Sequence, residues 1–315
     1  MQGLADATSM VTEQGVRTSI DTRASATPAG VWWPSRYGAD DEAGALNEIT
    51  PAARIAAARL IRSGRVFDLS HTLSAEIPAF EGRSFSQELD TPVGPIGRNR
   101  VGWVIERVMA PSQMGTHLDG LNHLHVGGRM YNGHRIDDVA EAWGTSRCSA
   151  DALPQIVTRG LLLDVAAVRG VERLERGEVV TPSDADAALS SAGLRVEPGD
   201  AVLFHTGWGR QWGTDDAAYV DGEPGPGSRM IEWLVERRVS VTGCDTWSYG
   251  AVPAEDPDEP FVVPQTLNAK HGVVVVENLH LAELADARVL QFLFVVSHAK
   301  LRGATGAWVA PLAIT

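Results

Sequence analysis

The chain has 315 residues, 44% of them hydrophobic, which is enough to bury a large core. Its 27 basic and 40 acidic residues give a formal charge of −13, which argues against a nucleic-acid partner, because phosphate binding needs a concentrated positive surface. The longest apolar runs, 273–276 and 290–296, are strand-sized and shorter than the roughly twenty residues that span a bilayer. We therefore expect a cytoplasmic protein with no membrane partner.

The first thirty residues are rich in Ala, Thr and Ser and lack the apolar centre of a secretory signal. We expect residues 1–30 to be a mobile arm and residues 31–315 to form a single domain. The cysteines Cys148 and Cys244 do not have metal-binding spacing, so both are expected to be buried and reduced.

Helices are predicted from their capping residues. Two Thr-Pro pairs, at 50–51 and 181–182, supply an N-cap followed by a proline that suits a first helical turn. Gly64 and Gly193 follow at positions where these helices would end. With one more amphipathic stretch, the sequence predicts three helices, over 52–62, 182–192 and 228–238.

Short runs rich in Val, Leu, Ile and Phe alternate with these helices, which is typical of strands. The predicted strands are 66–73, 103–109, 160–165, 201–205, 239–244, 272–277 and 290–296. We therefore expect an α/β fold with much strand.

The segment Gln113–His123 (QMGTHLDGLNH) concentrates two imidazoles, a carboxylate and a carboxamide. In an extended strand alternate side chains point the same way, so the four groups at 113, 117, 119 and 123 are expected to share one face. His117 and Asp119 could then bind one divalent cation through a nitrogen and an oxygen atom. An isolated His-x-Asp pair is more often polar surface, but four potential ligands or bases on one face favour a metal site.

This segment resembles the His-x-Gly-Thr-His-x-Asp-x-Pro-x-His signature of the metal-dependent cyclase family, which includes bacterial kynurenine formamidase and isatin hydrolase. Further blocks similar to the family's longer members follow in order at 37–47, 67–73, 125–133, 204–208, 243–246, 277–279 and 302–306. The resemblance implies a swivelling β/β/α domain with a central, partly barrel-like sheet. It also implies that residues 31–315 form a catalytic domain within a homodimer or homotetramer.

The resemblance implies a second half of the metal site, formed by a His and a Glu twelve positions apart, which here are Gln265 and Glu277. The first His of the signature is likewise replaced, by Gln113. Carboxamide oxygens are harder and weaker donors than imidazole nitrogens. We therefore expect one divalent ion, Mn²⁺ with Zn²⁺ as the alternative, and ligands drawn from Gln113, His117, Asp119, Gln265 and Glu277.

His123 lies four residues beyond Asp119, which is too far along a strand for easy ligation of the same ion, so we interpret it as a general acid and base. Phe80 aligns with a segment that carries a pocket aromatic residue in kynurenine formamidases. Trp33 and Trp308 are further candidates for binding a flat substrate, although each alone would more often belong to the core.

The sequence is thus interpreted as a metal-dependent hydrolase that opens a cyclic amide, lactone or formamide in a small-molecule substrate. A lyase or dehydratase acting through an enolate would need the same ion and base, and the resemblance does not separate the two. A non-catalytic metal-binding protein is the third interpretation, and the presence of His123 argues against it.

Overall fold

The structure is a computed structural model that describes residues 31–90 and 93–315. The mobile arm predicted over residues 1–30 lies outside the described residues. The chain divides into two units between Val31 and Trp32, and the second unit, Trp32–Thr315, contains every element described below. Within the described ranges, no helix is long and apolar enough to cross a membrane.

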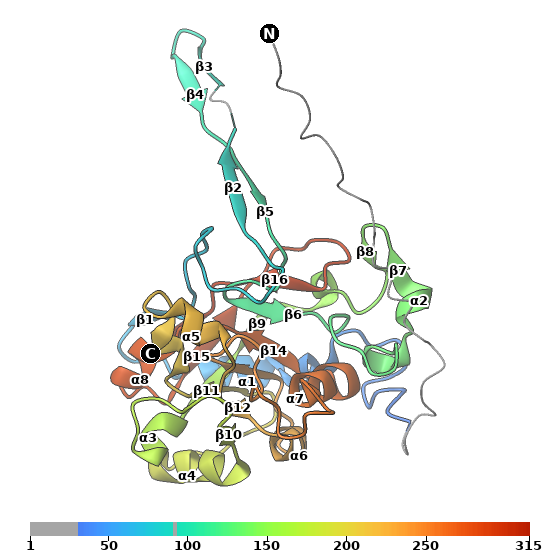
Figure 1. Cartoon of the computed structure of the whole chain (residues 1–315), viewed down its shortest axis with the longest axis vertical. Coiled ribbons are helices and arrows are strands. Elements are labelled where there is room, and N and C mark those ends of the chain that lie inside the picture. Colours follow the sequence, from blue (N-terminus) through green and yellow to red (C-terminus); the bar gives the residue numbers. More distant parts are fainter. Residues whose placement is uncertain (1–30, 91–92) are drawn as a thin grey trace, which may run out of the picture. The chain divides into compact units, whose positions relative to one another are not determined.

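A nine-stranded sheet forms the centre of the second unit (Figure 1). Strands β9, β11, β13 and β14 run parallel, and the remaining neighbours pair antiparallel. The sheet curls into a half barrel with flanking helices, which confirms the predicted α/β class with a partly barrel-like sheet. In spatial order its strands are β1 (Val66–Asp68), β17 (Leu312–Ile314), β15 (Gln291–Val296), β9 (Ile156–Asp164), β11 (Ala201–His205), β13 (Val241–Cys244), β14 (Val274–Glu277), β6 (His117–Asp119) and β16 (Gly306–Trp308).

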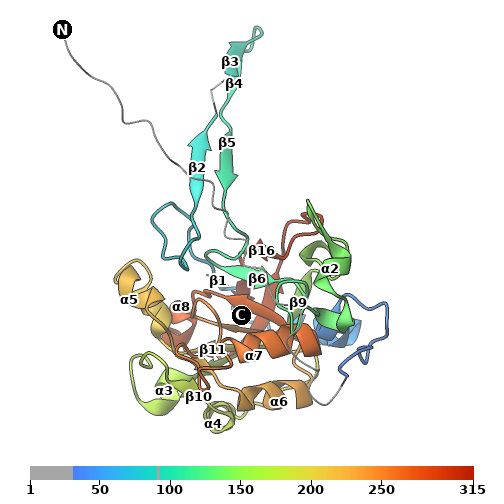
Figure 2. The same ribbon diagram turned by 45° about the vertical axis from the view of Figure 1, so that its right-hand side comes forward.

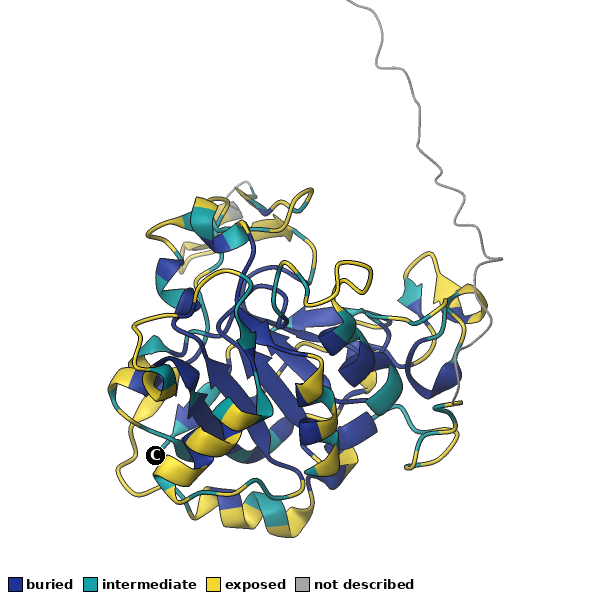
Figure 3. Ribbon diagram, turned by 60° about the horizontal axis from the view of Figure 1, so that its bottom comes forward, coloured by how far each residue is buried: buried dark blue, intermediate teal, exposed yellow. Residues whose placement is uncertain are grey.

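The parallel strands are buried on both faces, which explains the apolar runs at 161–163, 201–204 and 273–276. On β11, for example, Leu203 packs into one hydrophobic cluster, while Val202 and Phe204 pack into another. Figure 3 shows this buried sheet beneath helices whose outer sides are exposed. The two cysteines, Cys148 and Cys244, are free and buried within these clusters, as the sequence predicted.

The helices follow the predicted capping pattern. Thr181 forms a capping box with Asp184 at the start of the second predicted helix, and Gly193 ends that helix with a φ of 64°. The first predicted helix is shorter than expected, because it ends at Ala58. The α-helices are α1 (Pro51–Ala58), α2 (Ile136–Val139), α3 (Val165–Arg169), α4 (Pro182–Ala192), α5 (Asp216–Val220), α6 (Arg229–Glu236), α7 (Val262–Gln265) and α8 (Ala282–Asp286). Shorter helical turns are η1 (Gly44–Glu48), η2 (Tyr131–Gly133), η3 (Ala150–Ala152), η4 (Trp208–Gln211) and the π-helical η5 (Thr266–Lys270).

Two antiparallel ribbons lie outside the nine-stranded sheet, and Figures 1 and 2 show them extending away from it. We call them the ribbon arm, which consists of β2 (Ser86–Leu89), β3 (Val93–Ile96), β4 (Val101–Trp103) and β5 (Glu106–Met109). The strand predicted over 103–109 is therefore divided between β4 and β5. Smaller two-stranded pairs are β7 (Ala140–Glu141) with β8 (Gly144–Thr145), and β10 (Val179–Val180) with β12 (Gly225–Pro226).

Candidate metal centre

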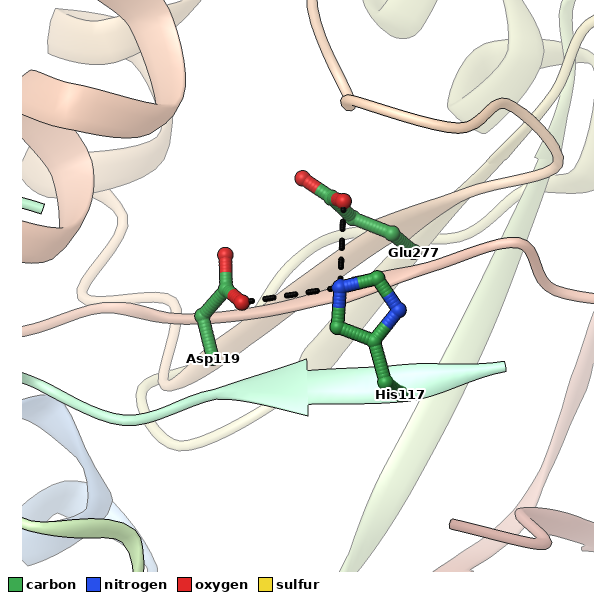
Figure 4. A group of neighbouring side chains, drawn as sticks. All are labelled: His117, Asp119 and Glu277. Atoms are coloured by element: carbon green, nitrogen blue, oxygen red, sulfur yellow. Dashed lines mark ion pairs between the residues drawn. The ribbon is translucent and has the colours of Figure 1, made fainter. Parts of the chain in front are cut away.

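Strand register brings three ionisable side chains together. His117 and Asp119 are two residues apart on β6, so their side chains leave the sheet on the same face. Glu277, the last residue of β14, pairs directly with His117 across the antiparallel ladder. Paired residues place their side chains on one face, so Glu277 joins the other two. Figure 4 shows the resulting group of three.

The three groups face one another at close range. The His117 Nε2 atom lies 3.6 Å from Asp119 Oδ1 and 3.3 Å from Glu277 Oε2. One ligand atom from each residue lies within 4.8 Å of the others, and all three side chains are buried. His117 Nε2 and Asp119 Oδ1 have no hydrogen-bond partner in the described structure. These two buried orphan atoms are the ones that a shared cation would satisfy.

A hydrogen bond on the far side of the imidazole determines which nitrogen of His117 can bind a metal ion. Its Nδ1 atom lies 2.8 Å from the Gly115 carbonyl oxygen, which can only accept, so Nδ1 carries the proton. Burial, the largest cause, lowers the pKa of His117, so the imidazole is neutral and Nε2 presents a lone pair. When both carboxyl groups are ionised, three electron-pair donors therefore face one another, an arrangement that is unfavourable without a cation.

Burial also disfavours the charged form of the two carboxyl groups. Burial is the largest cause that raises the pKa of Asp119, and it raises the pKa of Glu277 to about 7. The interaction with the nearby His123 lowers both pKa values and so opposes the effect of burial. A divalent ion at this place would favour the charged carboxylates much more strongly. One imidazole nitrogen and two carboxylate oxygens form a donor set that fits Mn²⁺ or Zn²⁺.

His123 approaches the group through a turn. Its backbone N–H donates to the Gly120 carbonyl at 3.0 Å, and this places His123 Nε2 3.9 Å from Asp119 Oδ1. The segment 113–123 is not extended throughout, because only His117–Asp119 forms a strand and Gly115 has a φ of 56°. The expected proximity of His123 to the group is nevertheless found. Its side chain is 25% exposed, so it lies beside the buried group with access to solvent.

The sequence model of the cyclase family matches residues 67–251, which is more than half of the chain. The chain belongs to the cyclase family. A crystal structure described as a novel cyclase is 26% identical, with a TM-score of 0.80, and the match covers 89% of this chain and 98% of that one. No curated protein matches the chain.

Two further solved structures share this cyclase-family fold. Isatin hydrolase A from Labrenzia aggregata, bound to benzyl benzoate, is 22% identical with a TM-score of 0.61, and the match covers 79% of this chain and 93% of that one. A potential metal-dependent hydrolase with cyclase activity is 17% identical with a TM-score of 0.51, covering 79% of this chain and 98% of that one.

The amide nitrogens of the two predicted glutamine ligands both donate hydrogen bonds. Gln113 Nε2 donates to Thr305 Oγ1 at 3.1 Å. A Cβ atom at Gly306, opposite Asp119 in register, would lie 2.6 Å from that Gln113 nitrogen, so the glycine makes room for the amide. Gln265 Nε2 donates to the His125 carbonyl at 2.9 Å. Ligation by either carboxamide oxygen stays a prediction.

The three predicted aromatic contacts lie in different surroundings. Trp308 pairs with His117 in register, and its indole N–H donates to the Pro111 carbonyl at 3.2 Å. Trp33 packs against Gly133, where a Cβ atom would lie 2.4 Å from its ring, and the Arg129 guanidinium lies over the same ring. Their roles in substrate binding stay predictions.

Phe80 has an aromatic neighbour that sequence reasoning missed. The ring centres of Phe80 and Trp247 lie 5.3 Å apart, and the ring centre of Phe261 lies 6.4 Å from that of Trp247. The completely buried Glu223 accepts hydrogen bonds from Trp247 N at 2.6 Å and Ser248 N at 3.0 Å, and so fixes the loop that carries Trp247. That loop follows the carboxyl end of the parallel strand β13, a position where binding residues commonly lie, and this was the available signal.

Proposed function

We propose that the chain is a metal-dependent hydrolase that opens a cyclic amide, a lactone or a formamide in a small-molecule substrate. The observation that carries this proposal is the buried group of His117, Asp119 and Glu277, in which two ligand atoms have no hydrogen-bond partner among the described residues. Membership of the cyclase family supports it, and so do the folds shared with an isatin hydrolase and with a potential metal-dependent hydrolase.

The group would hold one divalent ion through His117 Nε2 and the carboxylates of Asp119 and Glu277. Mn²⁺ suits this oxygen-rich set best, with Zn²⁺ as the alternative, and the carboxamide oxygens of Gln113 and Gln265 are additional candidate ligands. When bound, such an ion lowers the pKa of water and polarises a carbonyl oxygen.

His123 is the proposed general acid and base. It is close to Asp119, partly exposed and not part of the buried group, so its imidazole can reach both water and a substrate. In hydrolysis, His123 Nε2 accepts a proton as a water oxygen adds to the substrate carbonyl carbon. It then donates this proton to the nitrogen or oxygen that leaves when the C–N or C–O bond breaks.

Turnover in ¹⁸O-labelled water tests hydrolysis directly. The protein, supplied with Mn²⁺, is screened against small cyclic amides, lactones and formamides, and the products are examined by mass spectrometry. We expect one labelled oxygen in the new carboxylate, because ring or amide opening takes that atom from water. An unlabelled product formed with loss of water would instead identify a lyase or dehydratase, and metal binding without turnover would favour a binding protein.

We also propose that the chain forms a homodimer or homotetramer through the ribbon arm. Leu89 and Met109 of this arm are 73% and 77% exposed, and an isolated two-stranded ribbon is only marginally stable in water. Light scattering at micromolar concentration should therefore give a multiple of the chain mass. The double variant Leu89→Lys, Met109→Lys should shift the mass toward the monomer, and a monomeric wild-type protein would refute the proposal.

A further inference from the structure

Arg83 is a partly buried cation beside the candidate metal centre with no assigned role. Its Nη1 atom donates to the Gln113 carbonyl at 2.6 Å, and its Cζ atom lies 5.3 Å from the centre of the Phe80 ring. Gln113 begins the segment that leads into β6. The two contacts therefore hold the guanidinium between the segment that leads into the metal centre and the Phe80 ring, which itself lies beside Trp247.

The charge of Arg83 is not neutralised by a nearby carboxylate. Across residues 31–90 and 93–315, no Asp or Glu oxygen lies within 4.0 Å of its nitrogens. Two other partly buried arginines do have a carboxylate partner: Arg159 Nη2 lies 2.6 Å from Asp200, and Arg169 Nη2 lies 2.7 Å from Asp184. A partly buried guanidinium that contacts a neutral carbonyl and a ring still attracts an anion, and it has several N–H donors left.

The field of Arg83 reaches the metal centre. After burial, its charge is among the causes that shift the pKa of His117, Asp119 and Glu277, and it favours the ionised form of both carboxyl groups. A substrate whose carbonyl lies at the metal centre is therefore within the electrostatic range of this guanidinium. Its ring would lie near Phe80 and Trp247, whose ring centres are 5.3 Å apart.

We propose that Arg83 is a specificity-determining residue that binds the carboxylate of the opened product, or an equivalent anionic group on the substrate. The inference rests on the proposed function, because the opening of an amide or lactone produces a carboxylate. A guanidinium can bind the two oxygens of that group with two parallel hydrogen bonds. The substrates favoured by this arrangement are planar ring compounds that carry or acquire a carboxylate next to the ring.

Benzoate and benzamide have similar shapes but differ in charge, so a comparison of their affinities shows whether the charge of the ligand matters. Calorimetry is done on the full chain, both with Mn²⁺ and after chelation. The Arg83→Met variant should bind benzoate roughly 10- to 100-fold more weakly than the wild type, while its affinity for benzamide should change by less than about 2-fold. Arg83→Lys should recover only part of the loss, because lysine keeps the charge without the two-pronged geometry.

Arg65 offers a matched control, because its Cζ atom also lies over a phenylalanine ring, 4.6 Å from the centre of Phe67 on β1. The Arg65→Met variant should bind both probes like the wild type. Equal weakening of benzoate and benzamide in the Arg83→Met variant, or unchanged benzoate binding, would overturn the inference. If the Met variant does not fold, the benzoate-to-benzamide ratio of Arg83→Lys decides the question in the same way.

The outcome for Arg83 is separable from the outcome for hydrolysis. Selective loss of benzoate binding in a protein that hydrolyses none of the tested rings would support the anion site and refute the proposed function. Conversely, ¹⁸O incorporation by the wild type together with unchanged benzoate binding by Arg83→Met would support hydrolysis and refute the role of Arg83.

Discussion

Alanine at His117 or Asp119 is expected to remove the metal ion from the purified protein. The wild type should carry about one divalent ion per chain, because the centre supplies one imidazole and two carboxylates in a buried group. Loss of a direct ligand should lower the metal affinity by more than about 100-fold, since even residues that only orient ligands contribute 10- to 100-fold. Elemental analysis after dialysis measures the ion, and turnover should fall with it.

His205 provides a matched control for these variants. It is a buried histidine on β11 of the same sheet, and its Nδ1 atom lies 2.8 Å from Asp164, so it also forms a His–carboxylate pair. The His205→Ala variant should retain the ion. The site described here would be wrong if the wild type held no Mn, Zn, Fe, Co or Mg above buffer, if it held two zinc ions, or if only His205→Ala lost its metal.

Thermal unfolding distinguishes loss of the ion from loss of the fold. Without metal, Asp119→Ala should unfold at the same temperature as the wild type or higher, because it removes one of the buried electron-pair donors that face one another. Added Mn²⁺ should raise the unfolding temperature of the wild type, since it binds the folded state, but not that of Asp119→Ala. A variant that is unfolded in chelator would instead point to a structural role for Asp119.

Local patterns predicted the three longest helices and the parallel strands of the central sheet for physical reasons. Strands such as β11 are buried on both faces and therefore read as continuous apolar runs. Helix α4 begins at a Thr-Pro pair and ends at Gly193, because capping depends on residues within one turn. The order of the strands in the sheet, and the division of 103–109 between two strands of the ribbon arm, depend on distant pairings that no local pattern records.

The candidate metal centre could be predicted only in part for the same reason. The separation of two residues between His117 and Asp119 follows from strand geometry alone. Their meeting with Glu277 depends on the register between β6 and β14, and only the family resemblance pointed to it. His123 lies near Asp119 for a reason that strand geometry did not predict, since a turn at Gly120 brings it back to this residue. Arg83 and Trp247 had no periodic signal, because both lie outside regular elements.

The His123→Ala variant is expected to keep its ion and lose turnover by roughly 10²- to 10⁴-fold, the usual range for a positioned acid or base. The ion should stay because His123 Nε2 is 3.9 Å from Asp119 Oδ1 and lies outside the group of three ligands. Turnover should fall because water must then lose its proton, and the leaving group gain one, without help from the protein. Metal content and the turnover number are measured on the same preparation.

Rescue by imidazole and one control variant test whether the loss of turnover is specific to His123. Added imidazole should restore part of the activity of His123→Ala, since a small base can occupy the space left by the side chain, and it should not restore His117→Ala, which lacks the ion. His125 is the control, because it lies two residues from His123 and its imidazole is exposed. Its backbone carbonyl accepts a hydrogen bond from Gln265. His125→Ala should therefore turn over like the wild type. An unchanged rate in His123→Ala would exclude it as the base, and loss of the ion would make it a ligand instead.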